Sequence, residues 1–510
     1  MNIDRNASGI IDALCQYAAE EPVRMHMPGH KGKPTSLGGV APDPDMQRVC
    51  RILDDCRLLD VTECPGLDNL HYPSGCILRS EEMAQRVFGS LRSYFLINGA
   101  SCGVQASFLA ARMMLGPGKV ILPRNTHKSA ISAMVMSGFE PMWVRPDYYE
   151  DFGGYLPISE DDLSEALKSN RCNSDEDQVK AVFVVNPTYC GFARDLTRIA
   201  EIAHSWGAML IVDEAHGAHF GFNRMLPQSA LKCGADIVIH GTHKTTTAFT
   251  QTGLLHIASG AQNRFPDIAP SVEESLRSVQ STSPSYLLMS SLEQAIDVLQ
   301  QDESAWVRQS VDAALELTRR LEEIPFIGIS GHNGQTKMPQ GIFRDPSRIL
   351  VDLRDLNITG PEAARYLASE KSIVCEMAGP SYLVMIVTGA DGTQEIELVA
   401  DAFGDLSRRF GKQPSQSGHG SLRGLGEPPR PEKVQGLRES FLSPSQLMEI
   451  GNSQGRISAD TVVVYPPGSP LIVPGELISS EIIDYVLKAR DAGLNLVGRA
   501  IQQQGVYCVK

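Results

Sequence analysis

The sequence predicts an α/β protein whose largest part is a mostly parallel β-sheet covered by helices on both faces. Short, almost continuously apolar segments such as KVILP, AVFVV and AMLIV recur along the chain. Helical patterns separate several of these segments, and each segment ends in a polar turn. A parallel sheet that helices cover on both faces has such strands, because both surfaces of each strand are buried.

The first expected element is a short amphipathic helix at residues 9–19, where Ile10, Ile11, Leu14 and Tyr17 recur at helical spacing. Two segments rich in Pro, Gly, His and Asp follow, at residues 25–34 and 67–75. They are too polar for a core and too specific in composition for a linker.

Regular alternation begins near residue 76. A helix over 81–89 leads to a strand over 93–100 and to a helix that begins near Ser101. Four more strands, each ending in a polar turn, are expected at 119–125, 181–187, 208–215 and 236–244.

The second half of the chain predicts smaller units. A long helical region near 284–324 precedes residues 348–410, which read as strand, helix, strand, strand and helix. Residues 461–476 predict two strands around a Pro-Gly turn. The expected units are an N-terminal arm with active-site segments (1–75), a large cofactor domain (76–330), a small α+β domain (331–410), a linker rich in Pro, Gly and Ser (411–433) and a C-terminal domain (434–510).

Composition excludes several classes of function. The chain has 510 residues and a net charge of −14, which disfavours binding to a nucleic-acid backbone. Its eleven cysteines are scattered and never form a CxxC pair, so we expect reduced thiols in a cytoplasmic protein and no metal site. No apolar run approaches the roughly 18 residues of a membrane span, and charged Asp4 and Arg5 argue against a signal peptide.

The polar residues that follow the predicted strands indicate where a ligand binds. In sheets of this class they line the crevice at the carboxyl ends of the strands. Here they fall in the segments 98–101, 124–127, 186–188, 213–216 and 240–244.

Lys244 is the first candidate for chemistry. It follows an apolar strand and lies among Thr242, Thr245, Thr246 and Thr247. A surface lysine is the plain alternative. A lysine in a polar crevice can have a lowered pKa, and the threonines suit a phosphate, so we interpret Lys244 as a Schiff-base lysine beside a phosphate site.

Asp213, at the end of another strand, suggests a partner for that lysine. A carboxylate can keep the pyridine nitrogen of pyridoxal phosphate protonated, and the ring then acts as an electron sink. His216 is a neighbour of Asp213. Alternatively, Asp213, His216 and His219 form a zinc site, although HxxH alone is a weak signal.

Two further loops complete the candidate site. The segment NGASCG at 98–103 joins a strand to a helix, and the backbone there, with the Ser101 hydroxyl, suits a phosphate. His127 follows another strand and can stack on an aromatic ring, or it can be an ordinary structural histidine.

With the motifs MHMPGHKG, LDNLH, RNTHKS, VDEAHG and HGTHK in this order, and YPPGSPLIVPGE at 465–476, the chain resembles the Orn/Lys/Arg decarboxylase family. These are pyridoxal-phosphate enzymes of fold type I. The compact length resembles the branch that includes biosynthetic arginine decarboxylases, which act in polyamine biosynthesis.

The resemblance implies a role for each matching residue. Lys244 binds the cofactor covalently, Asp213 pairs with its pyridine nitrogen, and His127 stacks on its ring. Ser101 and the backbone at Gly99–Cys102 hold the phosphate, with Thr242 and His243. Thr282 or Ser283 reaches the cofactor of a neighbouring subunit, so a homodimer is the smallest active unit. Glu476 lies near the distal cationic end of the substrate.

The chain departs from the family pattern at Cys102, where the family usually has a hydroxyl residue. A thiol donates poorly to phosphate, so the phosphate site relies more on the backbone. Cys102 is either a tolerated substitution or a redox-sensitive thiol.

We therefore expect α-decarboxylation of a basic L-amino acid, with arginine, which gives agmatine and carbon dioxide, as the preferred substrate and with Lys244 or His243 returning the proton to Cα. Lysine and ornithine are the alternative substrates. An aminotransferase or aldol-type lyase is the rival enzyme, for which Arg354 or Arg365 would bind the substrate carboxylate. A non-catalytic regulator of the same fold is the third hypothesis, which the presence of Lys244 and Asp213 disfavours.

Overall fold

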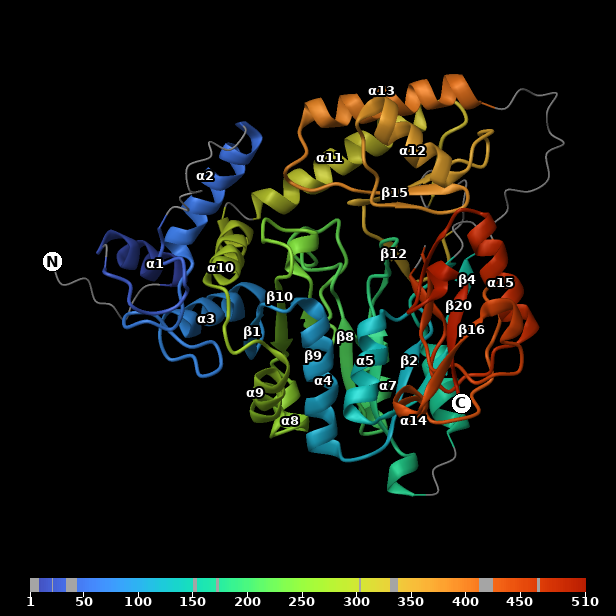
Figure 1. Cartoon of the computed structure of the whole chain (residues 1–510), viewed down its shortest axis with the longest axis horizontal. Coiled ribbons are helices and arrows are strands. Elements are labelled where there is room, and N and C mark those ends of the chain that lie inside the picture. The colour runs from blue at the N-terminus through green and yellow to red at the C-terminus, as the bar shows by residue number, and fades with distance from the viewer. Residues whose placement is uncertain are drawn as a thin grey trace.

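The computed structural model describes residues 9–20, 22–33, 44–149, 154–170, 174–301, 304–330, 338–411, 425–465 and 468–510. Figure 1 shows a central sheet, a layer with α11, α12 and α13 above it, a C-terminal segment on the right and two N-terminal helices on the left. Most of the expected linker, residues 412–424, lies outside the described residues.

The predicted sheet is present and has seven strands in the order β1-β10-β9-β8-β6-β2-β3. Its strands are β1 (Arg92–Leu96), β10 (Gly253–Ile257), β9 (Ile237–His240), β8 (Met209–Asp213), β6 (Val179–Val185), β2 (Lys119–Pro123) and β3 (Glu140–Val144). Of the seven, β10 alone runs opposite, because it pairs antiparallel with both β9 and β1. The link from β9 to β10 holds Lys244, and its only helical part is the short turn Thr242–Lys244, so no helix crosses over the sheet between these two strands.

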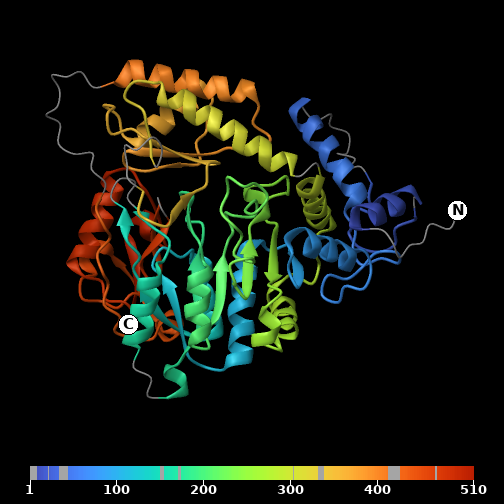
Figure 2. The same ribbon diagram turned by 180° about the vertical axis from the view of Figure 1, so that it is seen from behind.

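Helices cover both faces of the sheet (Figures 1 and 2). On one face α4 (Gly99–Leu115), α5 (Lys128–Ser137) and α9 (Ile268–Val279) bury a shared core, and on the other α6 (Glu160–Ser169) and α7 (Thr197–Ser205) bury a second. A Cβ atom at Gly103 would lie 2.7 Å from Leu96 Cδ1 and 3.0 Å from Ile239 Cγ2. Gly103 thus allows α4 to pack closely on the sheet. This close packing sets the position of the first turn of α4 relative to the strands.

The expected long helical region is two helices, α10 (Tyr286–Gln300) and α11 (Ala305–Glu322). Ser304, just before α11, has a φ of +60°, a left-handed conformation that ends helical propagation. The small α+β unit follows the predicted order, with β13 (Arg348–Asp352), α12 (Gly360–Lys371), β14 (Met377–Ala378), β15 (Tyr382–Ile386) and α13 (Thr393–Phe410). With β11 (Gly328–Ile329) its sheet has the order β11-β13-β15-β14.

A short ladder ties the small unit to the large one. β12 (Ile342–Arg344) pairs antiparallel with β7 (Phe192–Arg194), which follows β6. The ladder brings the start of β13 against the turn that follows β6. Arg348, the first residue of β13, therefore lies within reach of the carboxyl ends of the central strands.

The C-terminal segment has its own small core. The two strands predicted around the Pro-Gly turn are β17 (Val462–Tyr465) and β18 (Ser469–Ile472), and β19 (Asn495–Val497) joins them. A second ladder pairs β16 (Ser445–Glu449) with β20 (Gly505–Val509), and the helices are α14 (Leu437–Leu442) and α15 (Ser480–Asp491). No helix among the described residues combines the length and apolarity that a bilayer crossing needs.

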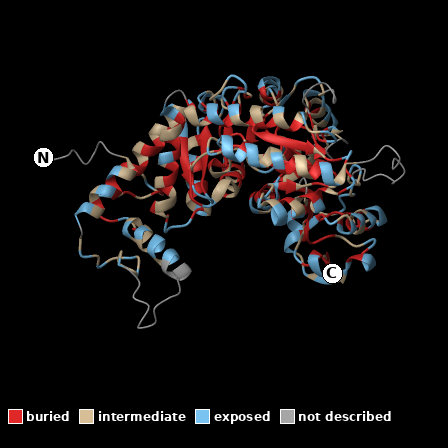
Figure 3. Ribbon diagram, turned by 90° about the horizontal axis from the view of Figure 1, so that it is seen from above, coloured by how far each residue is buried: buried red, intermediate tan, exposed pale blue. Residues whose placement is uncertain are grey.

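The N-terminal helices α1 (Ile10–Ala19) and α2 (Pro44–Leu59) lie at one end of the molecule, and part of α2 is exposed (Figure 3). The predicted helix at 9–19 is α1, and its apolar residues pack against α3 (Cys76–Phe88) and α10. Glu293 of α10 accepts hydrogen bonds from the backbone N–H groups of Ile10 (2.5 Å) and Ile11 (3.2 Å). A carboxylate therefore stabilises the positive end of α1.

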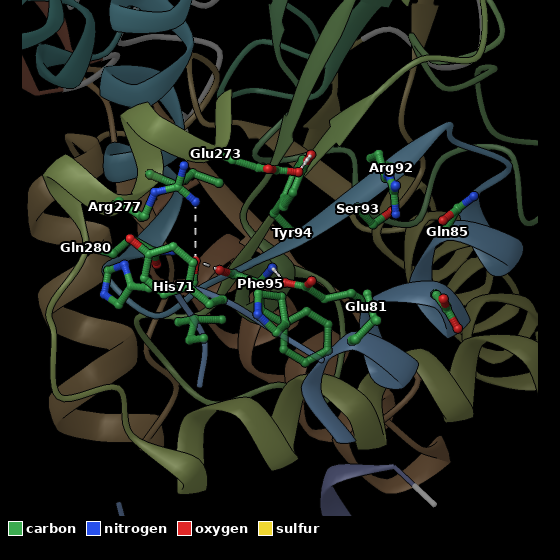
Figure 4. Close-up of a pocket in the computed structure, with 16 residues that line it drawn as sticks. His71, Glu81, Gln85, Arg92, Ser93, Tyr94, Phe95, Glu273, Arg277 and Gln280 are labelled. Atoms are coloured by element: carbon green, nitrogen blue, oxygen red, sulfur yellow. Dashed lines mark hydrogen bonds between the residues drawn. The ribbon is translucent and has the colours of Figure 1, made fainter. Parts of the chain in front are cut away.

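A cavity of about 430 Å³ lies beside the edge strand β1, between α3 and α9 (Figure 4). Its walls include Glu81, Tyr94 and Arg277. The Glu81 carboxylate accepts from Phe95 N at 3.0 Å. Burial raises the pKa of Glu81 to about 8, and Asp68 and Glu273 add to the shift. Glu81 is therefore protonated in the folded protein at neutral pH.

We expect the change Glu81→Gln to stabilise the protein at alkaline pH. The unfolded chain loses this proton above about pH 4.5, whereas the folded protein keeps it until about pH 8. Stability therefore falls as pH rises between these values, and glutamine, which still accepts from Phe95 N, removes the fall. Urea unfolding should show a gain on the order of 4 kcal/mol at pH 8 and little difference at pH 4.5. Equal stability of the two proteins at both pH values would contradict a protonated Glu81.

Candidate active site

Lys244 lies at the carboxyl edge of the central sheet, in the short helical turn Thr242–Lys244 that follows β9. The ends of β8 and β2, which carry Asp213 and the segment before His127, meet at the same edge. Asp213 and Glu376 both raise the pKa of Lys244 and Arg348 lowers it, so these three charges surround the amine. The parallel register of the strands thus brings together residues that lie far apart in the sequence.

The Lys244 amine is largely withdrawn from water. Its Nζ lies 2.9 Å from Nε2 of His216. Desolvation is the main cause that lowers the pKa of Lys244 below its ordinary value. A lysine in such a site is more often a free amine than a surface lysine is, and the free amine is the nucleophilic form.

Asp213 is buried at the end of β8, with 7% of its surface exposed. One carboxylate oxygen accepts from Ala215 N at 3.1 Å, which leaves the other oxygen available for a ligand. His127 caps the start of α5, where its Nδ1 accepts from Ser129 N. Desolvation chiefly lowers the pKa of His127, whereas the negative charge of Asp213 raises it.

The zinc alternative requires that the side chains of His216 and His219 converge on one metal ion. His216 contacts Lys244 and Arg348 through its two ring nitrogens, whereas His219 Nε2 lies 3.1 Å from Asp345. Across the described residues, no three His, Cys, Asp or Glu side chains are arranged to hold a metal ion.

The first turn of α4 provides an anion site. Asn98 precedes the helix and makes no side-chain cap, so N–H groups of the first turn remain available. Gly99 has a φ of +75°, and its own N–H donates to Gln251 O at 2.8 Å. The following N–H groups and the half-buried Ser101 hydroxyl remain for a ligand, and the helix dipole favours negative charge there.

The Cys102 thiol does not add a donor to this anion site. Its Sγ donates to Gly99 O at 3.0 Å and lies 3.9 Å from Gln280 Oε1. Burial raises the pKa of Cys102 to about 12. A thiol that stays protonated is not the reactive form, so the geometry argues against the redox-sensitive alternative. Because Asn98 is the N-cap, the Cys102 N–H makes the first hydrogen bond within α4, so the N–H groups left for a phosphate are those of Ala100 and Ser101.

Thr242 and His243 both form hydrogen bonds to Thr252, which directly precedes β10. The buried Thr242 hydroxyl donates to Thr252 Oγ1 at 3.3 Å, and His243 Nδ1 donates to Thr252 O at 2.8 Å. The Nδ1 contact leaves Nε2 of His243 as the unprotonated nitrogen of the neutral ring. Desolvation lowers the pKa of His243, so the neutral ring prevails.

Two predicted residues have other surroundings in this chain. Thr282 is exposed, in a loop whose Ser281 N donates to Asn98 Oδ1 at 3.1 Å, beside the start of α4. Glu476 is 2% exposed, and both its oxygens accept from the Arg124 guanidinium at 2.7 and 2.8 Å. Its role toward a substrate stays a prediction.

Sequence reasoning missed three residues that lie around Lys244. Arg348 is 1% exposed and donates through Nη2 to Nδ1 of His216 at 2.7 Å. The Tyr189 ring lies 4.7 Å from the His216 ring, and its hydroxyl donates to Glu376. The only signal for Arg348 was its position at the start of a predicted strand, whereas the two arginines considered, Arg354 and Arg365, are both exposed and Arg354 pairs with Asp352.

The donor set fits pyridoxal phosphate. It comprises a desolvated lysine, a buried carboxylate, an accessible imidazole and a helix start with free N–H groups at one sheet edge. The cavity of Figure 4 contains none of the predicted site residues, and we do not assign it to this site.

Comparison with known protein families gives two matches. The family model for the Orn/Lys/Arg decarboxylase major domain matches residues 9–335, and that for the C-terminal domain of the same family matches residues 435–510.

Similar proteins include arginine decarboxylases of Bacillus. The one from Bacillus anthracis is 31% identical over 96% of this chain and 94% of its own length, and the one from Bacillus subtilis is 30% identical over 97% and 96%. A lysine decarboxylase of Pseudomonas aeruginosa is 26% identical over 94% of this chain and 75% of its own length.

Solved structures show the same fold. Lysine decarboxylase A from Pseudomonas aeruginosa has a TM-score of 0.79 at 20% identity, covering 99% of this chain and 80% of its own. The lysine decarboxylase of Francisella novicida has a TM-score of 0.77 at 18% identity, covering 99% and 81%.

Proposed function

The chain belongs to the Orn/Lys/Arg decarboxylase family, and from that premise we propose that it converts L-arginine to agmatine and carbon dioxide with pyridoxal phosphate. The observation that carries this proposal is the desolvated Lys244 amine beside Asp213 at one sheet edge. Near-full-length similarity to proteins named arginine decarboxylase supports arginine as the substrate. A role in polyamine biosynthesis, in the cytoplasm, is the physiological setting that we propose.

Each site residue has a place in binding the cofactor. Lys244 binds it through Nζ, Asp213 meets its pyridine nitrogen, and His127 lies against its ring. Ser101 and the N–H groups of the first turn of α4 hold its phosphate. When bound, pyridoxal phosphate withdraws electrons from Cα of the substrate, which lets the carboxylate leave as carbon dioxide.

Two groups can return a proton to Cα. Lys244 Nζ is one, because burial lowers the pKa of its amine below the ordinary value, which makes the exchange of a proton easier than for an exposed lysine. His243 is the other, although its Nδ1 is held by Thr252 O and burial keeps its ring neutral. We assign the step to Lys244 and treat His243 as a residue that helps to hold the turn.

We propose a homodimer in which the loop with Thr282 and Ser283 reaches the phosphate site of the neighbouring subunit. The support is that the three residues Ser281–Ser283 are exposed while Ser281 lies against Asn98, at the start of α4. The loop is thus next to the phosphate end of the crevice and free to contact a second chain.

Glu376 is a second candidate for the distal cationic end of the substrate. It is exposed at the site, accepts from Tyr189 and raises the pKa of Lys244. Glu476, by contrast, has both oxygens on buried Arg124. The two carboxylates therefore predict different behaviour on mutation.

We expect Glu376→Gln to raise KM for arginine about tenfold with a smaller change in kcat, because the lost charge pairing weakens ground-state and transition-state binding alike. The matched change Glu476→Gln should instead lower stability by about 3 kcal/mol, since it leaves the Arg124 guanidinium buried and poorly paired. Steady-state kinetics and thermal unfolding of both variants measure this. A stable Glu476→Gln protein with a raised KM for arginine would show instead that Glu476 binds the distal cationic end of the substrate.

One observation about Arg348 favours transamination as a second candidate reaction. An aminotransferase needs an arginine of the second domain for the substrate carboxylate, and Arg348 has buried Nε and Nη1 atoms without a hydrogen-bond partner among the described residues. Its Nη2 is already engaged by His216, however, which ties the guanidinium to the lysine side of the site.

Product analysis tests the proposed function. The purified protein, loaded with pyridoxal phosphate, is incubated separately with arginine, lysine and ornithine, and the amines are identified by mass spectrometry. We expect agmatine as the dominant product. Dominant cadaverine or putrescine would change the substrate, and no amine from any of the three would refute decarboxylation.

A further inference from the structure

Three side chains from different elements form a linear hydrogen-bonded chain that ends at Lys244. Arg348 Nη2 lies 2.7 Å from His216 Nδ1, and His216 Nε2 lies 2.9 Å from Lys244 Nζ. Arg348 comes from β13 of the small unit, His216 from the turn after β8, and Lys244 from the turn after β9. These hydrogen bonds therefore cross the contact between the small and the large units.

The direction of these hydrogen bonds follows from the donors available. An arginine guanidinium has only N–H donors and no acceptor, so Nδ1 of His216 must present its lone pair. A neutral imidazole then carries its hydrogen on Nε2, and that N–H points at Lys244. The amine of Lys244 can accept this hydrogen bond only if it has a lone pair, that is, only as the free base.

The opposite assignment fails on proton count. If Lys244 were an ammonium, it would have to donate to Nε2, and His216 would then lack a proton on both nitrogens. Burial strongly lowers the pKa of His216, with Lys244 and Arg348 adding to the shift, so a doubly protonated ring is also disfavoured. Only the neutral Nε2–H form satisfies both contacts.

We propose that Arg348 is a positioning residue that fixes the Nε2–H tautomer of His216, through which His216 holds the Lys244 amine as the free base. The inference extends the proposed function, because the free base is the form that bonds to an aldehyde. It does not require that the reaction be a decarboxylation.

The residues packed around Arg348 hold its side chain in this position. A Cβ atom at Gly191, which has a φ of +85°, would lie 2.6 Å from Arg348 Cβ, so glycine there lets the arginine enter. Arg344 Nη2 donates to the Arg348 carbonyl at 2.6 Å. The carboxylates of Asp345 and Glu376 keep the guanidinium charged against the burial that lowers its pKa.

Other charged groups act on Lys244 as well. The test must therefore distinguish the electrostatic effect of these charges on the Lys244 amine from the effect of the hydrogen bonds. Asp213 and Glu376 favour the ammonium, whereas Arg348 disfavours it and burial does so most. His127 and His243 also face this cluster, since both of them act on the pKa of His216. Removal of Arg348 alone changes both a charge and a tautomer.

The experiment uses the full-length chain freed of cofactor and measures how fast Lys244 is acetylated by acetic anhydride across neutral and alkaline pH. Mass spectrometry of the peptide that contains Lys244 gives the apparent pKa of its amine. Exposed Lys232 in the same digest serves as the internal control. The measurement needs neither cofactor nor substrate, so its outcome is independent of the reaction catalysed.

We expect Arg348→Leu and His216→Phe each to slow the labelling of Lys244 at neutral pH about tenfold, which corresponds to one pH unit in the pKa of its amine. Arg348→Lys, which keeps a charged donor, should restore most of the rate. The double variant should label no more slowly than Arg348→Leu alone, because the loss of Arg348 already breaks the hydrogen bonds through His216.

Two outcomes would overturn the proposal. Unchanged labelling in His216→Phe together with slow labelling in Arg348→Leu would mean that Arg348 acts only through its charge. Unchanged labelling in both would mean that neither residue holds the amine. If Arg348→Leu does not fold, His216→Phe decides alone, and labelling of Lys244 at the wild-type rate in that variant would overturn the proposal.

Discussion

The change Lys244→Ala should abolish both covalent binding of pyridoxal phosphate and decarboxylation, with a loss of kcat of more than about a thousandfold. Lys244 is the desolvated amine at the sheet edge where Asp213 and His216 also lie, and its lowered pKa supplies the nucleophile. Alanine removes the nucleophile and leaves the turn after β9 otherwise intact.

Absorption spectroscopy checks this prediction. The wild-type protein should show the visible band of a lysine-bound cofactor, and borohydride should fix the cofactor to the Lys244 peptide. Lys244→Ala should lack the band, whereas Lys232→Ala, a matched change at an exposed lysine, should retain it. An intact band and unaltered activity in Lys244→Ala would remove Lys244 from the mechanism.

The change Asp213→Asn should leave the cofactor bound to Lys244 but lower kcat by about a hundredfold or more. An asparagine keeps the size of the side chain, and its oxygen can still accept from Ala215 N. It carries no negative charge, so it does not hold a proton on the pyridine nitrogen. The rate falls because electron withdrawal from Cα depends on that proton.

The spectrum separates this effect from loss of the cofactor. Asp213→Asn should retain a visible band that borohydride still traps on Lys244, and its melting temperature should stay near that of the wild type. Asp195→Asn, which alters the side chain that accepts from Thr197 N near the start of α7, provides a matched control with full activity. Full activity in Asp213→Asn would contradict its pairing with the pyridine nitrogen.

Local periodicity was sufficient to predict the central sheet. The segments that end at Pro123, Val185, Asp213 and His240 are parallel strands, because their apolar runs reflect burial on both faces. The direction of β10 was not predictable, since an apolar strand looks the same in either orientation. The break before α11 was also missed, because Ser304 gives no sequence signal for a left-handed conformation.

The candidate site was predictable where a residue follows a strand. Asp213, His127 and Lys244 are such residues, and strand order alone brings them to one edge. Arg348 was missed because it begins its strand, and its contact with His216 depends on the β12–β7 ladder between two units. The sequence predicted Cys102 at the phosphate site, but its thiol donates to Gly99 O, a contact that a linear motif does not reveal.

Glu476 shows why a motif does not specify a partner. The PGE turn is a local signal, whereas Arg124, which both Glu476 oxygens contact, lies far away in the sequence. A buried guanidinium needs a carboxylate, and this requirement is visible only after the chain has folded.

One measurement tests the central claim, that Lys244 serves the decarboxylation of a basic amino acid, most directly. Arginine labelled with ¹³C in its carboxyl group is incubated with the cofactor-loaded protein, and labelled carbon dioxide, agmatine and any keto acid are quantified together. We predict that carbon dioxide and agmatine form in equal amounts and that Lys244→Ala forms neither. Retention of the label in a keto acid, with no release of carbon dioxide, would show transamination and contradict the proposed function.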